Sequence, residues 1–473
     1  MTHSHHADAD DRAFLGHPRA LGYLAFAEAW ERFSFYGMQA LLVLYMVKQL
    51  LLPGHIEHVA GFGLFRIGLQ HLYGPLGTTQ ALASAVFGLY AGLVYITPFL
   101  GGLLADRVLG RTATITLGAV LMAIGHFLMA FDVSFLPALA CLVVGCGCFK
   151  GNLASQIGSL YGPGDLRRAD AFQIYYLAIN AGVILAPLVA GTLGEKVAWH
   201  YGFGVAGVGM LVALTGYLVA RKRLPPDPPL RARDPADRPK LRPGDGKAVA
   251  LLICLLPVLA IAMVANQQIF NAFLVWVEAH VELQVGGYQM PVTWMITFDS
   301  VVSVSALVIV AGFWRIWART RREPDEVTKI ALGCFVAALG MACLATGALV
   351  SGDHKVSALW VLAFIVLNEL GFANVAPVAL ALYARAAPPA MAATMIGLFY
   401  LHLAGANLLT GKIGGLLDTM SAPQFWLMHA GMALGAGLVF VVAKQLFGEI
   451  LTPKGEETSV EVVVLVAQEV PAS

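Results

Sequence analysis

Charge is scarce in this chain of 473 residues, because Asp, Glu, Lys and Arg make up only 12% of it. A soluble protein of this length needs far more charged side chains to cover its surface. The formal net charge is only +1. That balance gives no electrostatic support for binding nucleic acid, so we expect no nucleic-acid partner. Hydrophobic residues make up 58% of the chain, which predicts a membrane protein.

Three further absences exclude other classes of protein. The six cysteines all fall in apolar runs, where we interpret them as small buried side chains rather than disulfides. No His-Glu-x-x-His motif, Ser-His arrangement or paired aspartates stand out, so we expect neither an enzyme nor a resident metal or cofactor. His3, His5 and His6 favour a polar tail over a metal site. The first apolar run is too long for a cleavable signal peptide.

Long apolar runs dominate what is present, and each can cross a hydrocarbon core of roughly 30 Å. We predict an all-α membrane protein with 12 transmembrane helices in two six-helix bundles. The predicted spans are 20–51, 80–105, 112–131, 134–161, 170–195, 201–221, 248–281, 289–316, 328–350, 356–385, 389–416 and 423–447. The predicted domains are a tail (1–19), a first bundle (20–221), a proline-rich basic linker (222–247), a second bundle (248–447) and a second tail (448–473).

The distribution of Lys and Arg sets the predicted orientation. Alternate loops are basic, and they include Arg107, Arg111, Arg167, Arg168, the linker, Arg319, Arg321, Arg322 and Arg385. The intervening loops are poor in basic residues, apart from a long first outer loop at about 52–79 that contains Arg66. Because basic loops stay cytoplasmic, we expect both termini in the cytoplasm.

A group of three charges lies well inside the first predicted span, where each charge costs about 2.5–3.5 kcal/mol to insert. Glu28, Glu31 and Arg32 follow the spacing i, i+3, i+4, so they share one helical face. One arginine cannot neutralise two carboxylates, so one acid must pair elsewhere or hold a proton. A site that alternates between ion pair and protonated acid suits proton coupling. The alternative is a helix end pinned at the interface by snorkelling charges.

Two more charges lie deep in predicted spans. Lys150 is in the fourth span beside glycines that permit close helix approach, and we expect it to pair with Glu28 or Glu31. Glu369 lies mid-span in the second half, after Asn368. A lysine in one half and a carboxylate in the other would form a dipolar cavity suited to a zwitterion.

Asp299 and His402 are further candidate proton sites within predicted spans. Histidine titrates near neutral pH and could relay protons. The alternative for His402 is a neutral ring hydrogen-bonded to its helix backbone. The alternative for Asp299 is a hydrogen bond with a neighbouring hydroxyl such as Ser300 or Ser303.

The layout of six spans, a basic linker and six more resembles the major facilitator fold, in which two halves rock around a central site. The segment Gly102–Arg111 between the second and third spans resembles that superfamily's loop motif. By this resemblance Asp106, Arg107 and Arg111 form a cytoplasmic latch. The alternative is a generic basic loop.

The first-span motif Glu28-x-x-Glu31-Arg32-Phe33-x-x-Tyr36-Gly37 resembles the proton-dependent oligopeptide transporter family. The resemblance covers most of residues 20–447. Further matches are Leu93–Tyr95, Gly101–Arg111, Lys150 with Asn152, Phe172 to Gly182 with Tyr175, Tyr176 and Asn180, then Glu369, and Gly397 to Asn407 with Phe399 and Tyr400.

The resemblance implies a function and a set of site residues. It implies a symporter that imports di- and tripeptides with protons as the coupling ion, by alternating access. The implied proton-coupling residues are Glu28, Glu31, Arg32 and Lys150. The implied substrate-binding residues are Tyr36, Gln39, Tyr95, Lys150, Tyr176, Asn180, Glu369 and Phe399. The implied setting is a bacterial inner membrane, with the lipid bilayer as surroundings and a functional monomer.

Several positions depart from the family pattern. Gln39 stands where several members have an arginine, and Gly151 replaces a usual proline. Asn266-Gln267-Gln268 stands where many members carry a glutamate, which puts a proton site there in doubt. The alternative functions are transport of another substrate, such as nitrate, an organic anion or a drug, and a non-transporting membrane sensor. Glu369 disfavours a purely anionic substrate.

Overall fold

The computed structural model describes residues 12–162, 165–227, 245–388 and 390–451. That part of the chain is helical apart from its turns and one short hairpin. Residues 1–11 and 452–473 of the expected tails, and residues 228–244 of the expected linker, lie outside the described residues.

Ten helices of the described part are long and apolar enough to cross a bilayer. The helix α2 (Arg19–Tyr45) is not among them, and it carries the three charges of the first predicted span. The predicted span 389–416 is broken at Tyr400 into α15 (Ala392–Phe399) and α16 (Leu401–Gly414), each too short to cross alone. The total of twelve spans therefore stays a prediction.

The chain forms two compact units. Unit 1 comprises Met1–Tyr45, Pro53–Gly63 and Leu93–Arg233, and unit 2 comprises Met46–Leu52, Leu64–Gly92 and Asp234–Ser473. Residues 64–92 thus cluster with unit 2, although they lie within the bounds 20–221 predicted for the first bundle. Each unit is described by itself below.

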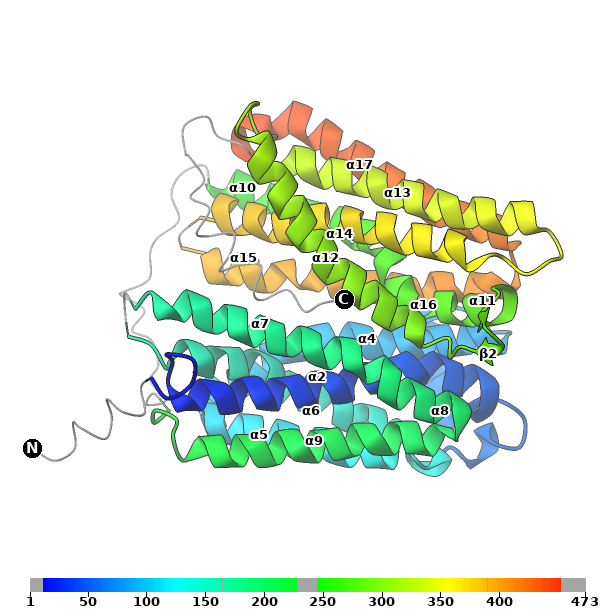
Figure 1. Ribbon diagram of the computed structural model, residues 1–473, viewed down its shortest axis with the longest axis horizontal. Helices are drawn as coiled ribbons and strands as arrows, with labels where there is room; N and C mark the ends of the chain where they lie inside the picture. The colour runs from blue at the N-terminus through cyan, green and yellow to red at the C-terminus, as the bar shows by residue number, and fades with distance from the viewer. Residues whose placement is uncertain (1–11, 163–164, 228–244, 389, 452–473) are drawn as a thin grey trace, which may run out of the picture. The chain divides into compact units, whose positions relative to one another are not determined.

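In unit 1, α2 packs against α7 and α9, and α5 packs against α6 and α9, as long helices that run side by side (Figure 1). The helices of this unit are α2, the second part of α4 (Thr79–Leu104), α5 (Arg111–Leu128), α6 (Phe135–Gly158), α7 (Arg167–Ala186), α8 (Thr192–Lys196) and α9 (Trp199–Arg221). Unit 1 also contains two short 3-10 helices, η2 (Ile56–His58) and η4 (Asp132–Ser134), and two short π-helices, η3 (Ala105–Leu109) and η5 (Pro187–Gly191).

Glycines allow the helices of unit 1 to approach closely. A Cβ atom on Gly182 of α7 would overlap the carbonyl oxygen of Ala29 and lie 2.9 Å from the Cβ of Arg32. A Cβ on Gly101 of α4 would likewise overlap the carbonyl oxygen of Gly147 on α6. These contacts hold α7 against the charged stretch of α2, and α4 against the helix that carries Lys150.

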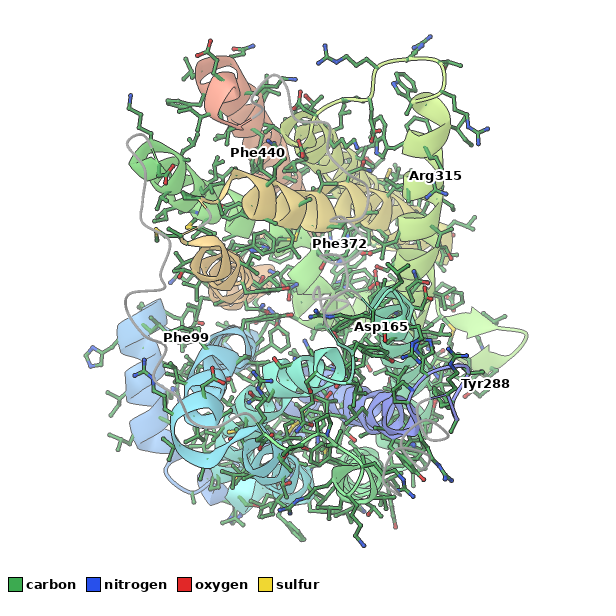
Figure 2. The ribbon with its side chains drawn as sticks, turned by 90° about the vertical axis from the view of Figure 1, so that its left-hand side faces the viewer. Phe99, Asp165, Tyr288, Arg315, Phe372 and Phe440 are labelled. Carbon is green, nitrogen blue, oxygen red and sulfur yellow. The ribbon has the colours of Figure 1, made fainter. Side chains whose placement is uncertain are left out.

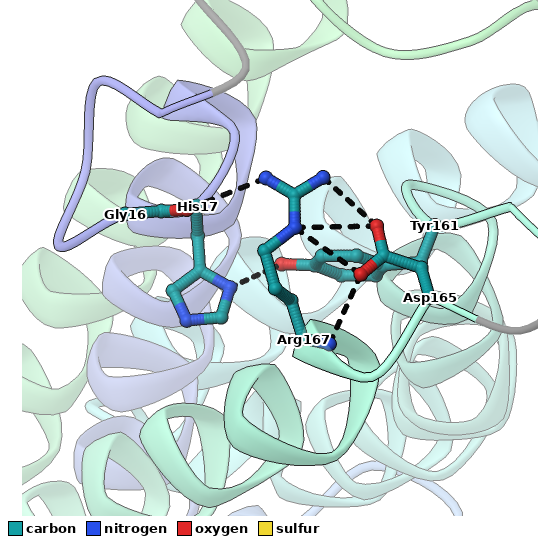
Figure 3. A network of polar contacts seen from close by, with 5 residues as sticks. All are labelled: Gly16, His17, Tyr161, Asp165 and Arg167. Carbon is teal, nitrogen blue, oxygen red and sulfur yellow. Dashed lines mark hydrogen bonds and ion pairs between the residues drawn. The ribbon is translucent and has the colours of Figure 1, made fainter.

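Gly16 and His17, just before α2, contact the loop between α6 and α7 (Figure 3). His17 Nδ1 lies 2.9 Å from the hydroxyl of Tyr161. Arg167 forms an ion pair with Asp165 at 2.8 Å and donates to the carbonyl oxygen of Gly16 at 3.4 Å. Hydrogen bonds from Arg167 hold the pKa of the Asp165 carboxyl below its usual value. This network fixes the segment from which α2 begins.

In unit 2, α13 packs against α14 and α17, α10 packs against α16 and α17, and α12 packs against α14 (Figure 1). The long helices are α10 (Asp245–Gln267), α12 (Trp294–Trp317), α13 (Glu326–Ser351), α14 (Ala358–Ala386) and α17 (Ala422–Leu451). The shorter elements are η1 (Met46–Leu50), most of α3 (Phe62–Tyr73), the first part of α4, η7 (Gln268–Phe270), α11 (Ala272–His280), α15, α16 and η8 (Gly415–Asp418).

Unit 2 also contains a hairpin of β1 (Gln284–Val285) and β2 (Tyr288–Gln289), which pair antiparallel with Val285 opposite Tyr288. Gly286 and Gly287 form its turn with φ of 58° and 83°, a conformation that glycine adopts without strain. Tyr288 of this hairpin and Arg315 of α12 are exposed side chains (Figure 2).

Candidate functional site

Unit 1 holds a buried cluster of charge on α2, which we call the first cluster: Glu28, Glu31 and Arg32. Arg32 Nε lies 2.8 Å from Glu28 Oε1 and 2.7 Å from Glu31 Oε2. All three side chains are buried, with at most 3% of any of them exposed. The helical spacing therefore brings the three groups together as predicted from the sequence, with the arginine in contact with both acids.

One arginine does not satisfy these two acids. The contact with Glu28 is a hydrogen bond, whereas Glu31 Oε2 meets Arg32 without hydrogen-bond geometry. Glu28 Oε2 and Glu31 Oε1 also have no hydrogen bond of good geometry among the described residues, although the Tyr175 hydroxyl of α7 contacts the Glu28 side chain. Buried acceptors without donors are costly, and a proton on one acid is the simplest remedy. The first cluster can therefore bind one proton.

Lys150 reaches the same region from α6. Its ammonium lies 4.1 Å from the ring centroid of Phe35 and 5.8 Å from that of Tyr95. It also contacts Cys146, one turn earlier on α6, and interacts electrostatically with Glu31. In the described part of the chain no ion pair within 4.0 Å joins it to either acid of the first cluster. Aromatic faces, rather than a carboxylate, hold this lysine.

The other predicted site residues of unit 1 lie on three helices. Tyr36 and Gln39 continue along α2 as buried side chains, and Tyr36 interacts electrostatically with Tyr95 and Arg32. On α7, the side-chain amide of Asn180 donates to the carbonyl oxygen of Tyr176 at 2.8 Å. The structure therefore brings Tyr36, Tyr95 and Lys150 together, whereas Asn180 donates to its own helix.

Unit 2 holds a different cluster, which we call the second cluster: Glu369, Asp299, Asn266, Asn368 and Ser303. Asn266 of α10 and Asn368 of α14 each donate to Glu369 Oε1 at 3.0 Å. Ser303 of α12 also contacts the Glu369 carboxyl group. Glu369 is fully buried, so these neutral donors take the place of water around it.

Asp299 of α12 lies against Glu369 at hydrogen-bonding range. It is 1% exposed, and its Oδ1 has no donor in the described part of the chain. The hydroxyl of Ser300 donates to its own helix at the carbonyl oxygen of Ile296, 2.8 Å away. The neighbour of Asp299 is therefore a second acid, and Ser303 is directed to Glu369.

The two remaining predicted residues of unit 2 lie at the break between α15 and α16. His402 Nδ1 is 2.5 Å from the carbonyl oxygen of Phe399, so its ring is bonded to the helix backbone. Phe399 is 1% exposed and packs on Tyr383 and His402, at centroid distances of 5.1 Å and 4.5 Å.

Two residues of the predicted latch, Asp106 and Arg107, lie on η3 and are exposed, and the third, Arg111, begins α5 and is half-buried. The acid that reaches this loop in the described part is Asp227, after α9. It accepts from the Thr112 backbone at 2.9 Å and from the Thr112 hydroxyl at 3.1 Å.

Sequence reasoning missed Asp227, Phe35 and the donor role of Asn266. Asp227 supplies a carboxylate to the first turn of α5, where negative charge is stabilising. Asn266 was noted only as a departure from a family pattern. A row of amides in the middle of an apolar run is itself a signal of a buried polar partner, and it could have identified Asn266.

The chain matches the family model described as Major Facilitator Superfamily over residues 51–411. The chain belongs to the Major Facilitator Superfamily. Curated members with similar sequences include an uncharacterized transporter, YclF, from Bacillus subtilis, with 27% identity over 88% of this chain and 91% of that protein. The peptide transporter YePEPT from Yersinia enterocolitica is 29% identical over 85% of this chain and 89% of its own. A di-/tripeptide transporter from Lactococcus lactis is 26% identical over 92% and 97%.

Solved structures of superfamily members have the same fold. A peptide transporter POT in complex with sulfate aligns with a TM-score of 0.82 and 26% identity over 94% of this chain and 98% of that one. A variant of a peptide transporter POT in complex with alafosfalin aligns with a TM-score of 0.82 and 27% identity over the same shares. Within the Major Facilitator Superfamily, the chain is therefore similar to POT family transporters, and its all-helical fold is theirs. Its relatives are named as transporters.

Proposed function

We propose that this protein is a proton-coupled symporter that imports di- and tripeptides. The observation that carries the proposal is the first cluster, in which Arg32 contacts two buried acids and leaves carboxylate oxygens without donors. The names of its relatives support a peptide substrate, since several are peptide or di-/tripeptide transporters. The similarity to a POT transporter in complex with alafosfalin supports it further.

The first cluster supplies the proton step. One acid of the Glu28–Glu31 pair takes a proton from the outer side, and Arg32 then neutralises the acid that remains ionised. Lys150 keeps its positive charge against the aromatic rings and is left to bind the peptide's carboxylate. Release of the proton on the inner side restores a second negative charge near Lys150 and weakens its hold on the carboxylate.

The substrate-binding residues complete the proposal. Tyr36, Gln39 and Tyr95 contact the peptide near Lys150, while Tyr176 and Asn180 bind its backbone from α7. In unit 2, Glu369 binds the α-ammonium group, and Phe399 contributes an apolar wall for side chains. Apolar contacts discriminate weakly between side chains, which suits a carrier of many peptides.

The setting of the protein is part of the proposal. Twelve spans in two six-helix bundles move by alternating access, with Asp106, Arg107 and Arg111 as a cytoplasmic latch. The protein works as a monomer in a bacterial inner membrane with both termini in the cytoplasm. Many large apolar side chains are exposed along its helices, which suits contact with lipid. Protons are the coupling ion, and no other cofactor is needed.

Uptake of labelled dialanine into proteoliposomes tests the function. We expect accumulation with an inward proton gradient and a negative interior, and loss of accumulation when a protonophore is added. Absence of uptake by folded protein would contradict peptide transport. Thermal-shift screening of anions and drug-like amines would then identify another substrate class.

The variant Glu31→Gln tests the coupling role of the first cluster. We expect it to exchange labelled for unlabelled dialanine across the membrane but to lose accumulation driven by the gradient. The matched control is Asp170→Asn, which changes an exposed acid of α7 and should accumulate peptide normally. Accumulation by Glu31→Gln at the wild-type level would refute the role given to Glu31.

A further inference from the structure

The second cluster places two carboxyl groups from different helices in contact. Asp299 lies on α12 and Glu369 on α14, two helices that pack together in unit 2. The side chains are within hydrogen-bonding range of each other, and neither is more than 1% exposed. Water is therefore unable to screen the repulsion between the two groups.

The groups that face this pair from neighbouring helices are neutral. Asn266 and Gln267 lie on α10, Ser303 on α12 and Asn368 on α14. Of the cations on α14 and on helices that pack against it, Lys329 pairs with Glu323, Arg385 with Glu326 and Lys444 with Asp325. The other two, Lys247 of α10 and Arg315 of α12, have exposed side chains. The histidines His402 and His429 are bonded to the backbone carbonyls of Phe399 and Phe425.

Two acceptor atoms of the pair have no donor in the described part of the chain. They are Oδ1 of Asp299 and Oε2 of Glu369, while Oε1 of Glu369 already accepts from two asparagines. Two ionised carboxylates cannot hydrogen-bond to each other, since both are acceptors only. A single proton changes this, because a protonated acid donates to its ionised neighbour.

We propose that Asp299 and Glu369 share one proton and together form a proton-binding site within unit 2. The site carries one negative charge in place of two, and the asparagines stabilise the oxygen that stays ionised. The shared proton also explains why Asp299 is buried, since no neighbour on its own helix donates to its Oδ1.

The consequence for transport rests on the proposed function, whereas the shared proton does not. A peptide ammonium that reaches Glu369 brings a positive charge and N–H donors to a pair that has neither. The ammonium then takes the place of the shared proton, which leaves the site. Binding of the amine and movement of a proton are thereby linked in unit 2.

Infrared spectroscopy of the purified full-length protein at neutral pH tests the shared proton directly. A protonated carboxyl group has a C=O stretching band that shifts in D₂O. We expect a band in the wild type that is smaller in the double variant D299N/E369Q, where only a contribution from the first cluster can remain, and that is unchanged in the control Asp170→Asn. Identical spectra of wild type and double variant in this region would show that both acids are ionised, which overturns the proposal.

The single variant Asp299→Asn tests the sharing. The new amide would donate to Glu369, as Asn266 and Asn368 already do, so Glu369 stays ionised. The part of the band that comes from the pair is then lost. Retention of the full band would mean that Glu369 holds the proton alone, which refutes the pair.

A transport measurement separates this inference from the proposed function. If peptide is transported, Asp299→Asn should change the net number of protons moved per peptide by about one, measured from the membrane potential at which net peptide flux reverses. An unchanged ratio would refute the role of the pair in coupling. If no peptide is transported at all, the proposed function fails, and the infrared result still decides whether the pair shares a proton.

Discussion

In unit 1 the buried acids Glu28 and Glu31 both contact Arg32, whereas in unit 2 Glu369 and Asp299 meet each other among neutral amides and a hydroxyl. Both arrangements keep carboxyl groups out of water, which costs several kcal/mol per ionised group without compensation. The first cluster offsets this cost with a permanent cation. The second can offset it only with a proton or an arriving cation. An acid beside arginine can stay ionised, while an acid beside an acid must respond to protons or ligands.

The largest expected effect is that of Arg32→Met, which makes the first cluster resemble the second. Removing one partner of a buried ion pair typically costs about 3–5 kcal/mol, because the other charge is left uncompensated. We expect a lower temperature of thermal unfolding and loss of peptide uptake. Arg32→Lys keeps the charge but loses the forked guanidinium geometry, so its unfolding temperature and peptide uptake should lie between those of the wild type and Arg32→Met. If Arg32→Met unfolds at the wild-type temperature and takes up peptide at the wild-type rate, this cation is not important for either property.

The variant Gln267→Glu adds a third acid beside the second cluster. Gln267 is 2% exposed and its amide donates to Asn266 Oδ1 at 3.4 Å. A carboxylate there loses the donor and gains no cation, so we expect a loss of about 1–3 kcal/mol in stability. Gln267→Met, similar in size and uncharged, is the control. Equal thermal unfolding of the two variants would show that acids accumulate in this cluster without cost.

Close helix packing supports both clusters, and alanine substitutions compare the two. Gly182→Ala would press α7 away from Arg32 in unit 1, and Gly371→Ala would place a Cβ 2.7 Å from the carbonyl oxygen of Gly333 in unit 2. Each should lose about 1–3 kcal/mol of stability through overpacking. Gly151→Ala, with no atom within 4 Å of the added Cβ, is the matched control. Thermal unfolding of all three checks this, and equal values would refute it.

The smallest effect is expected at the half-buried ion pair between Asp165 and Arg167 (Figure 3). The Arg167 side chain lowers the pKa of the Asp165 carboxyl, so its stabilisation is present at neutral pH. It should be lost as the pH falls below about 4, the usual aspartate value, through the lower pKa of the folded protein. We expect a slight destabilisation by Asp165→Asn at pH 7 that disappears in acid. If the difference in stability between the wild type and Asp165→Asn increases as the pH falls, the predicted direction of the pH dependence is wrong.

Local spacing was sufficient to predict the first cluster. Three charges at i, i+3 and i+4 must share a face of any helix, so the contact of Arg32 with both acids follows from the sequence. The membrane class and the superfamily were likewise predictable from apolar runs and motifs, and both are confirmed. These features depend on neighbours in sequence, which is why they could be read without a structure.

Contacts between distant helices could not be predicted in the same way. The pairing of Lys150 with an acid was expected from charge alone, but the position of Phe35 in space decides what the lysine meets. The contact of Asp299 with Glu369 depends on how α12 packs on α14. The break at Tyr400 lies within an apolar run that looks continuous in composition. Each depends on the packed surroundings and not on local pattern.

The position of Lys150 over the Phe35 ring has a consequence for speed. A lysine held by an ion pair must lose a strong partner before it can bind a new anion. A cation resting on aromatic rings gives up only about 0.5–2 kcal/mol. The barrier to binding a carboxylate at Lys150 is therefore low. After the carboxylate leaves, the ammonium group returns quickly to its contact with the aromatic rings.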